Sequence, residues 1–341
     1  MHAEGEATTA SRATLADVAR LAGVSAKTVS RVVGGDANVA PATRERVMEA
    51  ARRLRFRPNT LARSLRHGGR TNTVAFVIGD LTNPFYIQVA AGVERELATR
   101  GMTMLLAATE DEADSEARVV ETMLRQQVRA LLITPIAPDQ SYLEGERQLG
   151  TAVVCLDRPA HNLLADSVVL ANRTGTAEAV RGLLAVGHRR IAFVTRPADL
   201  YTHAERHAGY REALLAAGIT DPSPWERLSD LDGPSPEEAV RDLMSMAEPP
   251  TAIITGNNRA SAGALRALGR RLEEVAFIGF DDFDLADAFG ISVVAYDPTE
   301  LGRRAARLAL DRLADPTGPP HHIEIPTRVI HRGTGEVPPR G

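Results

Sequence analysis

Residues 14–33 constrain this chain more than any other part of its sequence. They read TLADVARLAGVSAKTVSRVV. Thr14 and Asp17 form a capping-box pattern, which predicts a helix that begins directly after Thr14 and ends at Gly23. Ser25 is then placed to cap a second helix. Two short helices joined by a glycine-containing turn are typical of a helix-turn-helix, whose second helix enters the major groove of DNA.

The second predicted helix has an inner and an outer face. Val29, Val32 and Val33 are spaced to pack inward against the first helix. The residues expected on the outer face are Ala26, Lys27, Ser30 and Arg31. Lys27 is the only lysine in the chain, since the other thirty-nine basic residues are arginines. Its position in the first turn favours a contact with a base or a phosphate over simple solvation.

Charge is distributed unevenly along the 341 residues. Residues 1–70 carry a formal charge of +7, which leaves −11 for the rest of the chain. A basic head on an acidic body indicates that only the head contacts nucleic acid. The length suits two or three domains, and 44% hydrophobic with 25% charged residues is ordinary for a globular protein.

The sequence lacks a cysteine pair, a signal peptide and a membrane span, and these three absences limit the cellular compartment that we expect. Cys155 is the only cysteine, which excludes an internal disulfide and a cysteine-rich zinc site. Residues 1–12 lack the apolar segment of a signal peptide, and no run approaches the roughly 18 apolar residues of a membrane span. We therefore expect a cytoplasmic protein that has no membrane partner and starts with a disordered tail.

Residues 58–72 are typical of a basic linker, but they also carry a helical pattern. Asn59 can cap a short helix in which Ala62 and Leu65 lie on one side. A helix of this length is unstable by itself, so we expect it to fold only against a partner.

From Thr73 onward, β-rich runs alternate with helical stretches. The predicted strands are VAFVIGD, TMLLAAT, ALLITP, AVVCLD, SVVLAN, IAFVT, TAIITG, VAFIGFD and SVVAYD. This alternation predicts parallel sheets with helices on both faces, and so many strands suit two subdomains better than one large sheet. The predicted fold class is therefore α/β, with a small all-α helix-turn-helix head and two doubly wound parallel-sheet subdomains.

The same patterns predict the domain boundaries. We expect a tail at 1–12, a helix-turn-helix domain at 13–57, a hinge helix and linker at 58–72, a ligand-binding and dimerisation domain at 73–335, and a tail at 336–341. Within the large domain we expect an N subdomain at about 73–165 with 298–318, and a C subdomain at about 166–297 with 319–335.

Polar and aromatic side chains follow four of the predicted strands. These residues are Asn83, Phe85, Tyr86, Asp157, Arg158, Asn257, Asn258, Asp281 and Asp282. In open α/β sheets a ligand lies beyond the carboxyl ends of the strands, and this mixture of carboxylates, amides, guanidinium and aromatic rings suits a polyol. Aspartate and asparagine at such positions are equally common as helix caps, so that alternative stays open for each residue.

Patterns of catalysis are absent from the sequence. It contains no GxSxG, Walker, HExxH or CxxC motif, and the glycines at 333 and 335 follow the last predicted strand without opening a helix. His321 and His322 are adjacent, so on a strand they face opposite ways and make a poor metal pair. We therefore predict a protein that is not an enzyme and has neither a cofactor nor a metal site.

Six motifs in this chain match one known family. They are LADVARLAGVSAKTVSRVV, RERVMEAARRLRFRPNTLARSL, NPFY, LDRP, AERHAGYREAL and IGFDD. With them the chain resembles the LacI/GalR, or lactose-repressor, family of bacterial transcription regulators from Thr14 to Gly333. The resemblance implies a head that binds DNA and an effector domain similar to periplasmic sugar-binding proteins.

The resemblance also assigns DNA contacts. It implies that bases are faced by Ala26, Lys27 and Arg31, that phosphates are held by Thr14, Ser25, Thr28, Ser30 and Asn38, and that a hinge helix starts at Asn59. Ala62 and Leu65 would then enter the minor groove, with Leu65 as a wedge between base pairs. Two hinge helices pack together in this arrangement, so the expected species is a homodimer on a near-palindromic double-stranded operator.

For the effector, the resemblance implies contacts from Asn83, Phe85, Tyr86, Asp157, Arg158, Arg206, Asn257, Asp281 and Tyr296. The negative charges of Asp157 and Asp281 balance the positive charges of Arg158 and Arg206. We therefore predict a nearly neutral set of contacts, which disfavours a strongly phosphorylated ligand. Tyr296 stands where the family has glutamine, and Leu231 where it stacks a second aromatic ring. Trp225 is a candidate substitute for that ring.

These observations predict a cytoplasmic DNA-binding transcription regulator, a repressor, whose operator affinity is controlled by a small molecule, most simply a sugar. An extracytoplasmic sugar-binding protein without DNA function is the main alternative, and an enzyme of sugar metabolism is the third class. A dimer is favoured over a coiled-coil tetramer because the last residues, GTGEVPPRG, contain no heptad pattern. The sequence does not specify the effector, the operator or the direction of control.

Overall fold

The computed structural model describes residues 13–36, 38–57, 71–195, 200–230 and 232–340. The chain forms two compact units, Met1–Thr71 and Asn72–Gly341, which we call the head and the body. No helix within the described residues is long and apolar enough to cross a membrane.

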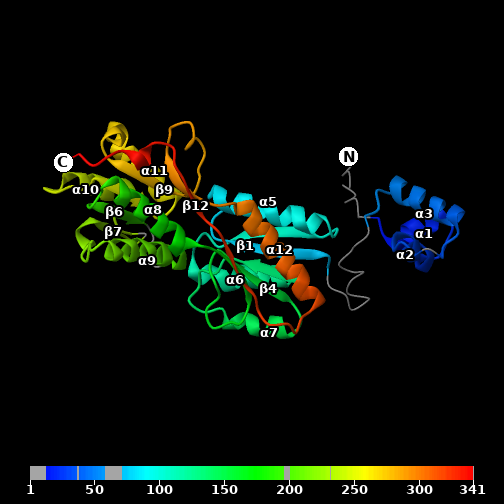
Figure 1. The fold of residues 1–341 in the computed structure, drawn as a ribbon. Coiled ribbons are helices and arrows are strands. Elements are labelled where there is room, and N and C mark those ends of the chain that lie inside the picture. Colours follow the sequence, from blue (N-terminus) through cyan, green and yellow to red (C-terminus); the bar gives the residue numbers. More distant parts are fainter. Residues whose placement is uncertain (1–12, 37, 58–70, 196–199, 231, 341) are drawn as a thin grey trace, which may run out of the picture. The chain divides into compact units, whose positions relative to one another are not determined.

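The described part of the head contains the helices α1 Leu15–Ala22, α2 Ala26–Val33 and α3 Pro41–Arg53 (Figure 1). The capping box is confirmed, because the Thr14 side chain accepts a hydrogen bond from the Asp17 amide while the Asp17 carboxylate accepts one from the Thr14 amide at 2.9 Å. Gly23 ends α1 in the left-handed region at φ 63°, and Ser25 caps α2 by accepting a bond from the Thr28 amide. The predicted helix-turn-helix is therefore present.

The three helices of the head share one small hydrophobic core. Val18, Val29 and Val47 contribute one fully buried side chain from each helix. Pro41 takes the first position of α3, after Ala40, which makes no side-chain cap. Each helix buries one apolar stripe, so the outer face of α2 stays accessible to a partner.

The described residues of the body form two six-stranded sheets. The first sheet is parallel, in the order β11-β5-β4-β3-β1-β2. Its strands are β1 Thr73–Ile78, β2 Thr103–Ala108, β3 Ala130–Ile133, β4 Ala152–Leu156, β5 Asp166–Leu170 and β11 His322–Ile325. Its helices are α5 Pro84–Ala98, α6 Ala113–Leu124, α7 Glu144–Gln148 and α12 Pro298–Ala314, with a 3-10 turn at Ser141–Leu143. We call this sheet with its helices the first lobe.

The second sheet has the order β12-β10-β9-β8-β6-β7, and only β12 is antiparallel to its neighbour. Its strands are β6 Ile191–Thr195, β7 Glu226–Leu228, β8 Ala252–Thr255, β9 Ala276–Phe280, β10 Ser292–Ala295 and β12 Arg328–Ile330. Its helices are α8 Asn172–Val186, α9 Tyr201–Ala216, α10 Pro236–Ser245 and α11 Asn258–Leu268, with 3-10 turns at Ser223–Trp225, Gly269–Glu273 and Thr334–Glu336. We call this part the second lobe.

Helices cover both faces of each sheet. In β1, Phe76 joins the core beneath α5 and α12, whereas Val77 joins the core on the side of α6. α5 and α12 lie side by side (Figure 1), and they approach closely at Gly92 and Gly302, where a Cβ would overlap the backbone of the other helix. In the second lobe, α8 and α9 pack on one face and α10 and α11 on the other. The predicted doubly wound α/β class is therefore confirmed.

The chain passes between the lobes three times. The crossings follow β5, β10 and β11. β11 and β5 are the first two strands at one edge of the first sheet, and β10 is next to the edge strand β12 in the second sheet. The carboxyl ends of the strands in both lobes then face a common cleft, as expected for open α/β sheets.

The structure corrects the sequence analysis on sheet membership. All nine predicted strands are present, but β5 and β11 pair in the first sheet, whereas the prediction placed residues 166–170 and 322–325 in the C subdomain. Apolar periodicity identifies a strand without showing which sheet it joins, and the crossing comes after β5 rather than before it. The short strands β7, β11 and β12 were not predicted.

Candidate functional site

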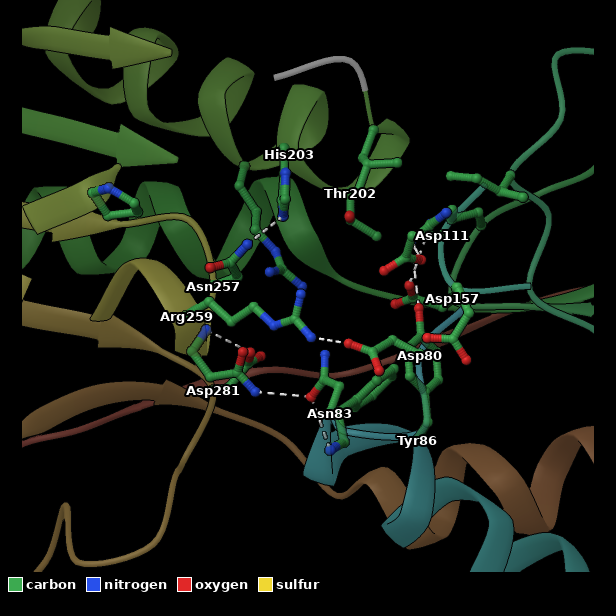
Figure 2. Close-up of a pocket in the computed structure, with 18 of the residues that line it drawn as sticks. Asp80, Asn83, Tyr86, Asp111, Asp157, Thr202, His203, Asn257, Arg259 and Asp281 are labelled. Atoms are coloured by element: carbon green, nitrogen blue, oxygen red, sulfur yellow. Dashed lines mark hydrogen bonds and ion pairs between the residues drawn. The ribbon is translucent and has the colours of Figure 1, made fainter. Parts of the chain in front are cut away.

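A pocket of about 700 Å³ lies between the carboxyl ends of the two sheets (Figure 2). All nine side chains expected at the effector site line it: Asn83, Phe85, Tyr86, Asp157, Arg158, Arg206, Asn257, Asp281 and Tyr296. The first five come from the first lobe, and the last four from the second lobe and its crossing segment. Folding thus gathers residues spread over more than two hundred positions around one pocket.

Arg206 forms the fixed part of the second-lobe wall. Its guanidinium stacks on the ring of Phe280, with 3.6 Å between Cζ and the ring centroid. Its Nε donates to Oδ1 of Asn172 at 2.8 Å, and Nη1 donates to the carbonyl oxygen of Gly256 at 2.6 Å. The side chain is 4% exposed. Arg206 is therefore held in one orientation by its own lobe.

Arg158 is the corresponding cation of the first lobe, but it is held more loosely. Nη1 donates to the carbonyl of Pro135 at 3.1 Å and Nη2 to the Tyr86 hydroxyl at 3.4 Å. The carboxylates of Asp157 and Asp111 lie 3.6 and 3.8 Å from its nitrogens. Nε of Arg158 and Oδ1 of Asp111 are buried without a hydrogen-bond partner among the described residues. This wall therefore retains one unused donor and one unused acceptor.

Asp157 and Asp281 occupy equivalent places at the ends of β4 and β9. Both have left-handed backbones, with φ of 66° and 72°, which is uncommon for a residue other than glycine. The amide of Asp157 donates to Val168 in β5, and the amide of Asp281 donates to Val294 in β10. The same local geometry in each lobe thus aims one carboxylate into the pocket.

Burial raises the pKa of several side chains in this pocket. Desolvation raises the pKa of Asp157 above its usual value, against the opposing effect of Arg158 and Arg206. Burial likewise raises the pKa of Tyr86 and, with the added effect of Asp281, that of Tyr296. Both tyrosines therefore remain hydroxyl donors, and the Tyr296 hydroxyl donates to Oδ1 of Asp281 at 2.6 Å.

Asn83 and Asn257 cap helices, as the alternative interpretation allowed, and they also line the pocket. Oδ1 of Asn83 accepts from the Phe85 amide at 3.1 Å, and Oδ1 of Asn257 accepts from the Ala260 amide at 2.7 Å. The Asn257 amide also faces Nε2 of His203 at 3.0 Å (Figure 2), which makes that ring nitrogen an acceptor. Capping fixes the direction in which each amide points.

Contacts between the lobes cross the pocket at the start of α11. Asn258 donates through Nδ2 to Oδ1 of Asn83 at 2.9 Å (Figure 2). Arg259 forms an ion pair with Asp80 and donates to the Thr82 hydroxyl at 3.1 Å. The two lobes are therefore linked directly on one side of the cleft.

The pocket is more acidic than the sequence analysis predicted. Seven carboxylates line it, from Asp80, Glu110, Asp111, Asp157, Asp230, Asp232 and Asp281, against three guanidinium groups from Arg158, Arg206 and Arg259. The prediction of a nearly neutral set counted two of each and omitted the acids on loops. The excess of negative charge disfavours an anionic ligand more strongly than that prediction did.

Several lining residues were missed, and two candidates lie elsewhere. Thr202 and His203, at the start of α9, line the pocket but carry no strand-end signal. Asp282 instead pairs with Arg332 through two bonds of 2.7 and 2.8 Å. Trp225 does not line the pocket, since its indole donates to the Glu248 carbonyl and its ring packs in the core of the second lobe. Leu231 lies outside the described residues.

The head presents the predicted DNA contacts mainly on its surface. Exposed side chains are those of Thr14, Ser25, Ala26, Lys27, Ser30, Arg31 and Asn38, and Thr28 is half-buried. Nε of Arg31 lies 2.7 Å from Oδ2 of Asp36, whose Oδ1 accepts from the Asn38 amide. Hydrogen bonds from Arg31 and Asn38 lower the pKa of Asp36. Asn59, Ala62 and Leu65 lie outside the described residues.

Comparisons with known proteins agree with this architecture. Residues 14–59 match the family described as bacterial regulatory proteins, lacI family, and residues 71–331 match periplasmic binding proteins and sugar binding domain of LacI family. The ribose operon repressor of Escherichia coli (strain K12) is 32% identical over 329 residues, which cover 94% of this chain and 99% of the relative. The regulator CelR of Thermobifida fusca is 35% identical over 337 residues, 95% of this chain and 98% of the relative.

A solved structure matches over nearly the same range. The transcriptional regulator CelR in complex with cellobiose has a TM-score of 0.69 and 32% identity, and the match covers 95% of this chain and 100% of the other. The similarity therefore spans head and body together.

Proposed function

The chain belongs to the LacI family of bacterial regulatory proteins, and from this premise we propose a function for each of its two units. It is a DNA-binding transcription regulator under the control of a small molecule, and it is not an enzyme. We assign operator recognition to the head and sugar sensing to the pocket of the body, in a repressor that acts on DNA in the cytoplasm.

The proposed DNA surface is the outer face of α2. The bases would meet Ala26, Lys27 and Arg31, and the phosphates Thr14, Ser25, Thr28, Ser30 and Asn38. The exposure of this face and the capping of α2 by Ser25 support the assignment. Asn59, Ala62 and Leu65 remain proposed contacts of the linker, with Leu65 as a minor-groove wedge.

The observation that carries the effector assignment is the gathering of nine expected side chains in one pocket. Acceptor carboxylates, donor guanidiniums and three aromatic rings suit a ligand with many hydroxyls and one apolar face. The unused donor of Arg158 and the unused acceptor of Asp111 suit a hydroxyl, which both accepts and donates. The names of two relatives point the same way, one to ribose and one, through its solved complex, to cellobiose.

The coupling mechanism that we propose is a change in the closure of the lobes. A sugar that contacts both walls favours one relative arrangement, and that arrangement changes how two linkers of a homodimer meet on a near-palindromic operator. By linkage, sugar and operator must then affect each other's affinity by the same factor. Leu285 and Phe289 are exposed apolar side chains of the second lobe and are candidates for the dimer contact.

The deciding experiment measures operator binding with and without sugar. A duplex is first selected from random double-stranded DNA with the full chain, and a thermal-shift screen identifies sugars that bind. Fluorescence anisotropy then gives the Kd of the duplex at fixed salt in each sugar. We expect at least one sugar that binds to change this Kd by about 5- to 150-fold. An unchanged Kd with every sugar that binds would refute the coupling.

A matched variant separates the two assignments. Replacing Lys27 and Arg31 together with alanine should remove specific operator binding, while the thermal shift produced by the sugar stays the same. Loss of both responses would show that the variant is misfolded or that the assignment of the head is wrong. The alternative of an extracytoplasmic binding protein has no role for residues 14–59, which match the DNA-binding family.

A further inference from the structure

The pocket extends across most of the width of both sheets. Its lining residues follow β4, β3, β1 and β2 in the first lobe and β9, β8, β6 and β7 in the second. The distance from β4 to β2 is three strand spacings, or roughly 14 Å. A six-membered ring built from bonds of about 1.5 Å is roughly 3 Å across, and roughly 6 Å with its hydroxyl oxygens. One sugar ring therefore covers less than half of the pocket's length.

The volume leads to the same conclusion. A cavity of about 700 Å³ corresponds to the liquid volume of roughly two dozen water molecules. A hexose has about half as many non-hydrogen atoms, and ligand pockets bury most of the surface of their ligand. A single ring would leave much of this space to solvent.

The two ends of the pocket differ in chemistry. The inner end, beside the crossings, holds Asp157, Asp281, Arg206 and Tyr296. The outer end is lined by Glu110 and Asp111, which follow β2, and by Asp230 and Asp232, which precede α10. We call these four residues the outer site. β2 and β7 hold equivalent places in the two sheets, so each lobe contributes two acids.

The carboxylates of the outer site favour a ligand that donates hydrogen bonds. Ionised carboxylates only accept, and negative charge from both lobes along this end of the pocket disfavours an anion. Oδ1 of Asp111, in the outer site, and Nε of Arg158 are buried without a hydrogen-bond partner among the described residues, and the nearest opposite charges lie 3.8 and 3.6 Å away. Arg158, whose side chain is 7% exposed, lines the pocket between the two ends, so its donor lies within reach of a ligand that spans both.

We propose that the effector is a neutral oligosaccharide of at least two rings. One ring lies at the inner end between Arg206 and the aromatic side chains, and the next ring donates its hydroxyls to the outer site. Asp111 and Arg158 pair with groups near the linkage between the rings. This inference rests on the proposed function, because it specifies the class of sugar that the same pocket takes.

Calorimetry with the full chain tests this inference. The probes are common hexoses and pentoses, their di- and trisaccharides with different linkages, one phosphorylated disaccharide and one disaccharide that carries an amino group. We expect a disaccharide to bind at least tenfold more tightly than its component monosaccharide, and its phosphorylated form to bind at least tenfold more weakly. A monosaccharide that binds as tightly as its own oligosaccharides would overturn the inference and leave the proposed function intact. A preference for the amino or phosphorylated form would also overturn it.

If no sugar in the whole panel binds, the proposed sugar class fails and this inference falls with it. A variant provides a second, independent readout. Changing Asp230 and Asp232 together to asparagine should weaken disaccharide binding at least fivefold without altering the binding of the monosaccharide. The matched control changes Asp114 and Asp284, two exposed acids outside the pocket, to asparagine and should alter neither. Equal losses for both sugars in the outer-site variant would exclude a second ring at this position.

Discussion

The two lobes of the body repeat one strand order, yet they hold their pocket arginines in different ways. Arg206 of the second lobe has two short hydrogen bonds and the face of Phe280 behind it. Arg158 of the first lobe has two longer bonds, and its Nε has no hydrogen-bond partner within the part of the chain that the structure describes. A repeated fold therefore does not imply a repeated role. The second lobe supplies a prearranged wall, and the first lobe retains hydrogen-bonding capacity for a ligand.

The largest effect is expected from replacing Arg206 with methionine. Asn172 and the Gly256 carbonyl would lose their donor in a buried place, so we expect the free energy of unfolding to fall by about 2–4 kcal/mol. Effector affinity should fall more than about 100-fold. Denaturant unfolding and calorimetry measure these changes. Arg181→Met, at an exposed position of α8, is the control and should change neither quantity.

Replacing Arg158 with methionine should separate binding from stability. Its hydrogen bonds, at 3.1 and 3.4 Å, are longer than those of Arg206, so we expect a stability loss clearly smaller than for Arg206→Met. Effector affinity should still fall about 10- to 100-fold, because a charged hydrogen bond is worth about 1.5–3 kcal/mol. Equal stability losses in the two arginine variants would contradict the difference between the lobes.

Asp157→Asn should stabilise the body while it weakens effector binding. Because burial raises the pKa of Asp157, its charged form opposes folding above the folded pKa, and this penalty disappears as the carboxyl takes up a proton on lowering the pH. Asparagine tolerates the positive φ. A gain of about 1 kcal/mol would raise Tm by roughly 2–4 °C near pH 7, and the gain should shrink toward acid pH.

The equivalent residue of the second lobe is the control for this prediction. Asp281 accepts hydrogen bonds from the Asn258 amide and the Tyr296 hydroxyl. Each carboxylate oxygen accepts one of these bonds, and asparagine would set its NH2 group against one of the two donors, so Asp281→Asn should give no gain in Tm. A similar gain at both positions would mean that the two strand ends are electrostatically alike.

The smallest effect is expected at the contacts that join the lobes. Arg259 is 57% exposed, so its ion pair with Asp80 should contribute less than about 1 kcal/mol, and Arg259→Ala should change effector affinity by at most about fivefold. High salt should abolish this difference. Asn258→Ala removes the neutral bond to Asn83, so its effect should not depend on salt. A salt-independent effect of Arg259→Ala would refute the role of the ion pair.

The features that the sequence predicted well are local ones. Thr14 and Asp17 lie within one helical turn of each other, so their capping box is readable directly. Apart from the edge strand β2, the nine predicted strands are buried on both faces of their sheets, which makes them continuous apolar runs. The strands that were missed contain three or four residues and lie at sheet edges, where half-exposed side chains such as those of β7 and β12 leave no apolar run.

The sequence predicted the residues at the centre of the candidate site, but several residues at its margin were missed. Asp157 and Asp281 directly end strong strands, so the rule of strand ends finds them. Asp80 and Asp111 also follow predicted strands, and the same rule applied to every strand would have included them. Asp230 and Asp232 follow a strand that was not predicted, so no signal marked them. Arg206 lies inside a helix and was found through the family resemblance alone.

The three crossings between the lobes have a consequence for how the chain is made. The first lobe begins at β1 but is completed by α12 and β11, which are synthesised after all of the second lobe except β12 and the turn at Thr334–Glu336. Leu301, Ala305 and Ala309 of α12 belong to the core of the first lobe. A nascent chain that ends before Pro298 thus leaves α5 uncovered. The first lobe can finish folding on the ribosome only after β11 has emerged, and the second lobe only after β12 has emerged.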